Sequence, residues 1–374
     1  MTNEYDLALR FFCDFGADIN TVMSNGLTPL LFACKHGQMA LVQALLASPS
    51  RQRDVKDPRG NSAHMLTCYS DPRVFFALQE MNDDEILSRN KVGRTIFHVA
   101  CEYGRETVVA ALVRRSLLDV NAPDTDGNTP LMLACKRNHG AVVTQLLAHP
   151  RLAIDATNKD GLTALHETAR AGHVRLLRLL LESTTTTVEA RSAAGTTPLM
   201  EAVDQRKPGV VTFLLRQPTI DANAVDNDGN TAFMRHCMHS DYNVLEALLS
   251  SPEVDINRRN HAGMTALALA CHANDPMLAA QLMQLPQLDV ATIDASCGHI
   301  ALAVACALQY DHVVRKLLSS PEIDVNYRDA SGLTALLQVC LNQGNVKIVQ
   351  LLLEKPEIDT SVRDKAILAS CKRC

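Results

Sequence analysis

The sequence contains no tryptophan and few other aromatic residues, so its core cannot be built around large rings. Aromatic residues make up 4% of the 374 residues. Hydrophobic residues nevertheless account for 47% and charged residues for 21%, which is ordinary for a folded soluble protein and unlike a disordered chain. The core must therefore consist of leucine, valine, isoleucine, alanine and methionine, which favours thin helical layers.

A basic excess, a long apolar run and a secretory signal are also missing. The formal net charge of -5 disfavours general binding to nucleic acid or anionic membranes. The longest apolar run, residues 300–308, is far too short to span a bilayer. The first ten residues, MTNEYDLALR, have no apolar core. We expect a soluble protein with no membrane partner, in the cytoplasm, with the nucleus as the alternative.

What the sequence has in abundance is repetition. A phrase that starts with glycine recurs ten times, for example as GLTPLLFAC at Gly26, GNTPLMLAC at Gly127 and GMTALALAC at Gly263. Successive glycines are 34 residues apart, with one step of 33 and one of 35. A fixed period of this length indicates a repeat architecture in which neighbouring units bury one another's apolar faces.

Each phrase begins with a turn and a helix cap. The glycine permits a sharp turn, and the threonine two residues later is suited to accept a free backbone N–H at the helix start. This threonine recurs as Thr28, Thr95, Thr129, Thr163, Thr197, Thr231, Thr265 and Thr334, and proline follows it as Pro29, Pro130 and Pro198. A second segment with helical apolar spacing follows, as in Val142, Val143, Leu146 and Leu147. Each repeat is therefore predicted to form an antiparallel helix pair.

The phrase resembles the ankyrin repeat, whose motif runs Gly-x-Thr-Pro-Leu-His-x-Ala and continues into a second helix and an Asp-Val-Asn turn. Second-helix matches such as AVVTQLL and VKIVQLLLE and closing turns such as GADIN and IDVN extend the resemblance over nearly the whole chain. It implies an all-α ankyrin-repeat solenoid of stacked helix-turn-helix hairpins with projecting turn tips. The expected organisation is one array over residues 1–374, with a partial repeat at 1–22, about ten full repeats at 23–362 and a truncated repeat at 363–374.

The cysteines that recur in the repeat are interpreted as packing residues rather than as disulfides or ligands. Nine occupy one position of the repeat, namely Cys34, Cys68, Cys101, Cys135, Cys237, Cys271, Cys306, Cys340 and Cys371, and Ala169 and Val203 fill that position elsewhere. A position that accepts Cys, Ala and Val requires a small apolar group. Stacked helices also lie too far apart for a disulfide, and zinc needs about four converging ligands. A metal- or redox-active protein remains the alternative.

The remaining polar motifs do not assemble into an active site. Cys297 is expected in an exposed turn beside Gly298, and Cys371 and Cys374 form an isolated Cys-x-x-Cys at the end of the chain. His98 and His166 match the family's histidine, which helps to hold adjacent repeats together. The densest cluster, MRHCMHS with His236 and His239, lacks a completing carboxylate. We expect no enzyme activity, no cofactor and no metal.

Two asparagines suggest a modification. Asn257 and Asn326, in LSSPEVDIN and LSSPEIDVN, resemble ankyrin asparagines that are hydroxylated. An asparagine in this turn also stabilises the loop by its own hydrogen bonds.

Function is expected on the surface formed by the turn tips and the exposed side of the first helices. In the resembled family this concave surface binds partner proteins. The candidate partner-binding residues are Arg59, Lys91, Val92, Arg94, Tyr103, Lys136, Arg137, Lys159, Asp228 and His261. The cations among them favour an acidic peptide or protein, and the negative net charge does not favour nucleic acid. The expected function is a protein-interaction scaffold or adaptor, with the substrate receptor of a larger regulatory assembly, such as a ubiquitin ligase, as the alternative.

Overall fold

The structure is a computed structural model. It describes residues 18–47, 55–78, 83–115, 118–182, 187–238, 243–273, 275–289, 295–319, 323–328, 332–341 and 345–361. The chain divides into two compact units, Met1–Ala194 and Gly195–Cys374. The second unit begins at the glycine of the sixth repeat phrase. Cys13, Cys371, Cys374 and His239 lie outside the described residues.

Helices occur in pairs, one pair to each repeat. Those of the first unit are α2 (Pro29–His36), α3 (Met39–Ala47), α4 (Ala63–Thr67), α5 (Pro72–Ala77), α6 (Asp83–Leu87), α7 (Ile96–Glu102), α8 (Glu106–Val113), α9 (Pro130–Lys136), α10 (Gly140–Leu147), α11 (Ala164–Ala171) and α12 (Val174–Leu181). Those of the second are α13 (Pro198–Asp204), α14 (Pro208–Leu215), α15 (Ala232–Met238), α16 (Leu245–Leu249), α17 (Ala266–His272), α18 (Pro276–Met283), α19 (Ala295–Ala307), α20 (Asp311–Leu318), α21 (Ala335–Leu341) and α22 (Val346–Leu353). The short helix α6 is an addition that the repeat pattern does not predict.

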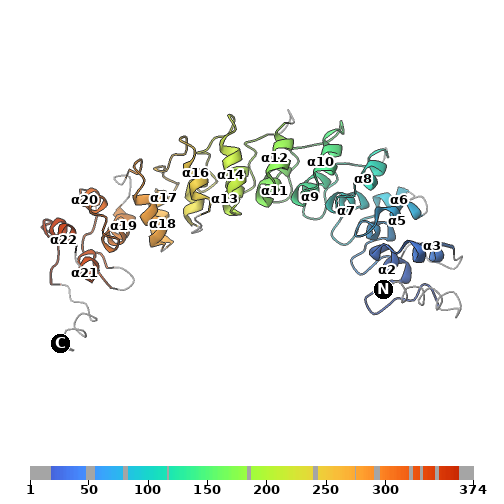
Figure 1. Ribbon diagram of the computed structural model, residues 1–374, viewed down its shortest axis with the longest axis horizontal. Coiled ribbons are helices and arrows are strands. Elements are labelled where there is room, and N and C mark those ends of the chain that lie inside the picture. The colour runs from blue at the N-terminus through green and yellow to red at the C-terminus, as the bar shows by residue number, and fades with distance from the viewer. Residues whose placement is uncertain are drawn as a thin grey trace. The chain divides into compact units, whose positions relative to one another are not determined.

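Within each unit the repeats stack in two layers of helices. In the first unit, α7, α9 and α11 form a row of first helices and α8, α10 and α12 a row of second helices, as Figure 1 shows. Each first helix packs against its own second helix and against the first helix of the next repeat in the same unit. The described residues contain no strand, and their one isolated bridge pairs Val225 with Thr231. The predicted all-α repeat fold is therefore confirmed.

The predicted caps and turns are present. Thr129 is extended at φ -82° and accepts the N–H of Met132, while Pro130 occupies the start of α9. The glycine of the same repeat, Gly127, has φ +83°, a conformation that L-residues avoid. A Cβ on Gly127 would also lie 2.8 Å from the backbone nitrogen of Lys159 in the next tip. Glycine is thus required both by the turn and by the close approach of neighbouring tips.

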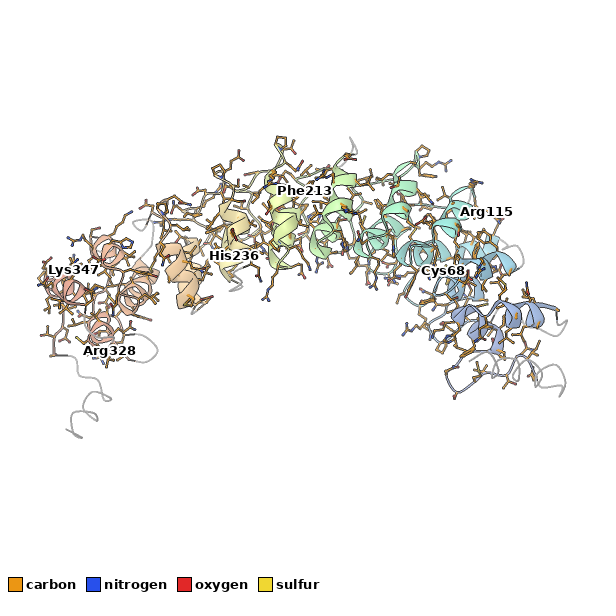
Figure 2. The ribbon with its side chains drawn as sticks, viewed as in Figure 1. Cys68, Arg115, Phe213, His236, Arg328 and Lys347 are labelled. Carbon is orange, nitrogen blue, oxygen red and sulfur yellow. The ribbon has the colours of Figure 1, made fainter. Side chains whose placement is uncertain are left out.

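The repeated cysteine position lies inside the helix stack. Its thiols at Cys34, Cys68, Cys101, Cys135, Cys237 and Cys306 are all fully buried and free. Figure 2 shows Cys68 among the helices of the first unit. Burial raises the pKa of Cys34 and Cys135 to about 12, so these thiols are poor nucleophiles.

Cys340 departs from this prediction, because it is exposed. It lies on α21, which is the first helix of the last repeat that the structure describes. In the earlier repeats the first helix of the next repeat packs on this side. The sequence pattern identifies the position but does not show whether a neighbour covers it.

Thiol labelling should distinguish these two environments. We expect a maleimide to modify Cys340 well before Cys34, Cys101, Cys135 or Cys237 under native conditions, because the buried thiols react only after local opening. Mass spectrometry of digested samples over a time course measures the order. Equal labelling rates for Cys340 and Cys135 would contradict burial of the repeated position.

A second departure concerns the repeat at Gly298. The phrase predicts a turn there, yet α19 runs from Ala295 through Gly298 to Ala307. The position that carries a capping threonine in other repeats is Ile300, which has no side-chain acceptor. Without that cap the helix begins earlier, so Cys297 lies within a helix and not at a turn tip.

His98 connects the start of its helix to the next repeat. Its Nδ1 accepts the N–H of Thr95 at 3.2 Å, and its Nε2 donates to the carbonyl of Ala122 at 2.8 Å. The ring is fully buried. In the following repeat Met132 takes this position, and its Sδ lies 3.4 Å from the N–H of Thr129. The role expected for the histidine is therefore confirmed at His98.

The stability of the first unit should depend on pH through His98. Burial lowers its pKa from 6.5 to about 4, so the folded state binds fewer protons than the unfolded state between these values. The contribution of the neutral ring is complete above its unfolded pKa and is lost as the pH falls towards the folded pKa, by about 2 kcal/mol between about pH 7 and pH 5. His98→Met should reduce this pH dependence, as urea unfolding at the two pH values would measure. A variant with the same pH dependence as the wild type would contradict the assignment.

Candidate functional site

The predicted tip residues form a row in each unit. Backbone hydrogen bonds join successive tips, from Lys91 N to Arg59 O at 2.9 Å and from Lys159 N to Asp126 O at 3.0 Å. In the second unit the same bond runs from His261 N to Asp228 O at 3.0 Å. Neighbouring tips are therefore fixed side by side, and their side chains project from a common edge.

Other predicted residues lie where the first helices end. Lys136 is the last residue of α9, Arg137 follows it, and Tyr103 follows α7. Of all the candidates, Tyr103 and Arg94 are half-buried and the rest are exposed: Arg59, Lys91, Val92, Lys136, Arg137, Lys159, Asp228 and His261. We call the tips and helix ends of the first unit, from Arg59 to Lys159, the tip-and-helix surface.

Arg94 connects the two parts of this surface. Its Nη1 lies 2.6 Å from Glu102 Oε2 at the end of α7, and its Nε lies 3.1 Å from Asp124 Oδ2 in the next tip. The Asp124 side chain is only 1% exposed. The guanidinium is therefore held in an internal ion-pair cluster and neutralises two carboxylates, which the sequence alone does not indicate.

Two further candidate cations are partly compensated. Arg137 lies 3.4 Å from Glu102, and Lys136 lies 3.7 Å from Glu167. Both side chains remain more than half exposed, so they can reorient towards a partner. Within the residues that the structure describes, Arg59, Lys91 and Lys159 take part in no ion pair.

A cluster of the same kind occurs in the second unit. Arg235 on α15 binds Asp226 at 2.6 Å and also binds Asp204 through Nε at 3.1 Å. Asp204 and Asp226 occupy the repeat positions of Glu102 and Asp124 in the first unit, but the arginine comes from a different position. Wherever both positions are acidic, an arginine lies between them. The sequence analysis did not identify Arg235, although acids at both of these repeat positions indicate that a cation lies between them.

Tyr69 is a second residue that the sequence analysis missed. Its ring lies 4.5 Å from that of Tyr103, centroid to centroid, with a tilt of 47°. It follows Cys68 directly, as Glu102 follows Cys101 and Lys136 follows Cys135, so its position on the surface can be read from the repeat register. The two half-buried rings provide an apolar area among charged neighbours.

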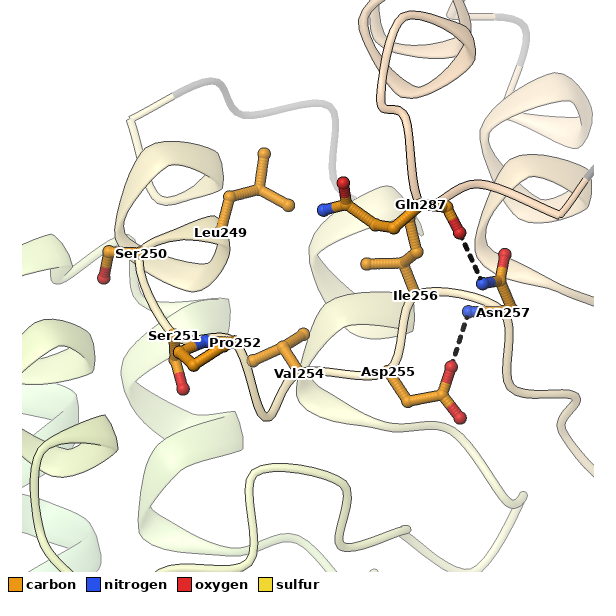
Figure 3. A pocket seen from close by; sticks show the side chains of 9 residues that line it. All are labelled: Leu249, Ser250, Ser251, Pro252, Val254, Asp255, Ile256, Asn257 and Gln287. Atoms are coloured by element: carbon orange, nitrogen blue, oxygen red, sulfur yellow. Dashed lines mark hydrogen bonds between the residues drawn. The ribbon is translucent and has the colours of Figure 1, made fainter.

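The closing loops of the second unit form a different feature, a cleft of about 550 Å³. Figure 3 shows its lining, which includes Leu249, Pro252, Val254, Ile256 and Gln287.

Asn257, at the edge of this cleft, joins two consecutive closing loops. Its Nδ2 donates to the carbonyl of Gln287 at 2.8 Å, and its Oδ1 accepts the N–H of Asp289 at 2.7 Å. Asn326 makes the same pair of bonds to Glu357 and Asp359. Both side chains thus join their own loop to the loop of the next repeat, whereas the sequence indicates only bonding within one loop.

The described residues present no cluster suited to metal chemistry. No group of three or more His, Cys, Asp or Glu side chains is positioned to hold a metal ion in the part of the chain that the structure describes. His236 is buried on α15, and Figure 2 shows it within the helices of the second unit. In the same described part, no helix has the length and apolar character needed to cross a membrane.

Comparison with known families assigns the chain. The family model of ankyrin repeats in three copies matches residues 64–158, 141–226, 209–294 and 274–364. A second model, of ankyrin repeats in many copies, matches residues 1–46. These matches cover most of the sequence and agree with the capped helix pairs and the glycine turn tips. The chain belongs to the ankyrin-repeat family.

Proposed function

We propose that this protein is a non-catalytic scaffold or adaptor that binds a partner protein through the tip-and-helix surface of its first unit. Ankyrin repeats are general protein–protein interaction modules. The main support for this proposal is that the surface cations fall into two groups, one held in ion pairs and one exposed without them in the part of the chain that the structure describes. Arg94 is occupied by Glu102 and Asp124, whereas Arg59, Lys91 and Lys159 are exposed at successive tips.

The electrostatics favour a partner with an acidic surface. The exposed tip cations have no ion pair within the described residues, and long side chains at a surface can steer an oppositely charged partner. Val92, 47% exposed, and the tyrosine rings supply the apolar part of the contact, which is less sensitive to salt. The protein as a whole is acidic, so this local positive surface differs from its average charge.

Affinity capture with matched variants tests the proposal. Proteins captured by the wild type and identified by mass spectrometry are compared with those captured by Arg59→Glu/Lys91→Glu and by Arg114→Glu/Arg115→Glu. Figure 2 shows Arg115 at the edge of the first unit, beyond the end of α8. We expect the tip variant to lose a partner that the control retains. Partners captured equally by both variants but lost on substitution of Asp228 and His261 would place recognition in the second unit instead.

A further inference from the structure

Two pairs of side chains from adjacent repeats belong to the tip-and-helix surface, one pair at the tips and one pair at the ends of the first helices. Arg59 and Tyr69 belong to one repeat, and Lys91 and Tyr103 to the next. The backbone bond from Lys91 N to Arg59 O fixes the two tips, and the ring contact of 4.5 Å fixes the two tyrosines. Each repeat therefore contributes one exposed cation and one half-buried ring.

The carboxylates close to these side chains are already satisfied. Asp57 Oδ1 accepts the N–H groups of Arg59 and Asn61 at 2.9 and 2.7 Å, and Oδ2 accepts Asn61 Nδ2 at 2.9 Å. Glu102 is held by Arg94 at 2.6 Å and by Arg137 at 3.4 Å. The negative charges thus point into turns and ion pairs, while the charges of Arg59 and Lys91 face solvent.

The tyrosine pair is unusual in a chain with so few aromatic residues. Tyr69 is partly buried, and burial together with the neighbouring Tyr103 raises its pKa, so the phenol stays neutral. A neutral, half-exposed ring pair offers an apolar face and a hydroxyl, which is the combination found at energetic centres of protein interfaces. Val92, exposed beside Lys91, adds apolar surface at that tip.

The separation of the repeats limits the form of the ligand. Packed helices lie about 8–10 Å apart, and an extended peptide advances about 3.3 Å per residue. Because side chains of an extended peptide alternate between its two faces, two carboxylates two or four residues apart lie on one face and would reach the cations of both tips. Arg94, at the tip of Lys91, reaches Glu102 beside Tyr103 at 2.6 Å, so an aromatic side chain on the same face of the peptide can extend from the tips towards the tyrosines.

We propose that Arg59, Lys91, Tyr69 and Tyr103 form a docking site for a short extended acidic segment of the partner, which has an aromatic side chain between its carboxylates. This inference rests on the proposed function. The cations bind the carboxylates, and the two tyrosines pack against the aromatic side chain. A basic segment is excluded by Arg59 and Lys91, since the nearby carboxylates that could bind it are engaged.

Selection from a random peptide library tests the ligand class directly. The full chain is used to select short peptides, and their dissociation constants are measured by fluorescence polarisation. We expect the selected peptides to carry aspartate or glutamate close to an aromatic residue. Arg59→Glu/Lys91→Glu and, separately, Tyr69→Leu/Tyr103→Leu should each weaken binding by about tenfold or more. Arg114→Glu/Arg115→Glu, with Tyr69 and Tyr103 intact, should leave it unchanged.

Several results would overturn the inference. These are selected peptides that are basic or lack an aromatic residue, unchanged binding by the tyrosine variant, and tighter binding of a single-stranded oligonucleotide than of the peptides through the same four residues. Circular dichroism spectra of the variants establish that they are folded. If no peptide is selected while a captured protein still depends on Arg59 and Lys91, the inference fails and the proposed function stands. If substitutions at the tips of either unit leave the capture of every protein unchanged, the proposed function fails as well.

Discussion

Replacing Arg94 with methionine is expected to lower the free energy of unfolding of the first unit by about 3 kcal/mol. The substitution leaves Asp124, whose side chain is 1% exposed, and Glu102, at 12%, without their common cation. A buried carboxylate that loses its partner retains the full cost of desolvation. Urea unfolding followed by circular dichroism measures the change.

Two companion variants separate this effect from the loss of a surface charge. Arg59→Met removes an exposed cation of the same unit and should change stability by no more than about 0.5 kcal/mol. Adding Asp124→Asn to Arg94→Met should restore part of the loss. The amide oxygen can still accept the N–H groups of Asp126 and Asn128, while the buried charge is gone. An Arg94→Met variant as stable as Arg59→Met would contradict the ion-pair cluster.

Replacing Gly161 with alanine is expected to destabilise the first unit by at least about 2 kcal/mol. Gly161 has φ +73°, and a Cβ there would lie 2.4 Å from the backbone nitrogen of Ala193 in the next tip. That nitrogen donates to Asp160 O at 2.9 Å, so the clash also displaces the bond that joins the tips. Backbone atoms cannot move aside as the end of a flexible side chain can.

Gly140 provides the matched control. It begins α10 with no positive φ, and a Cβ there would meet nothing within 4 Å. Gly140→Ala should therefore be neutral or stabilise the unit by up to about 1 kcal/mol. The two variants are compared by thermal unfolding under identical conditions. Equal losses of stability in Gly140→Ala and Gly161→Ala would show that the contact between stacked tips does not determine the cost of replacing glycine.

The repeat register predicts local structure well because each repeat contains its own turn, cap and helix signals. Thr129, Pro130 and Gly127 have the roles that their positions indicate. The same logic fails at Ile300, where the cap is missing and α19 begins early. It also fails for Cys340, because exposure depends on what packs against a repeat and not on the repeat's own sequence.

The candidate surface is less predictable from sequence than the fold. Register places Arg59, Lys91 and Arg94 near the turn tips, but it does not distinguish an exposed cation from one held by acids of two repeats. The ion pairs of Arg94 depend on side-chain directions across a repeat boundary. Arg94 is therefore a poor position for testing partner binding, since its reversal would perturb the fold itself.

Hydrogen–deuterium exchange of the full chain, with and without a captured partner protein, shows which tips and helices the partner covers. We expect the partner to slow exchange in peptides covering Arg59 to Tyr69 and Lys91 to Tyr103. Peptides of α8 and of α14, which lie outside the surface, should be unchanged. Protection confined to second helices, or to the tips around Asp228 and His261, would contradict binding at the tip-and-helix surface of the first unit.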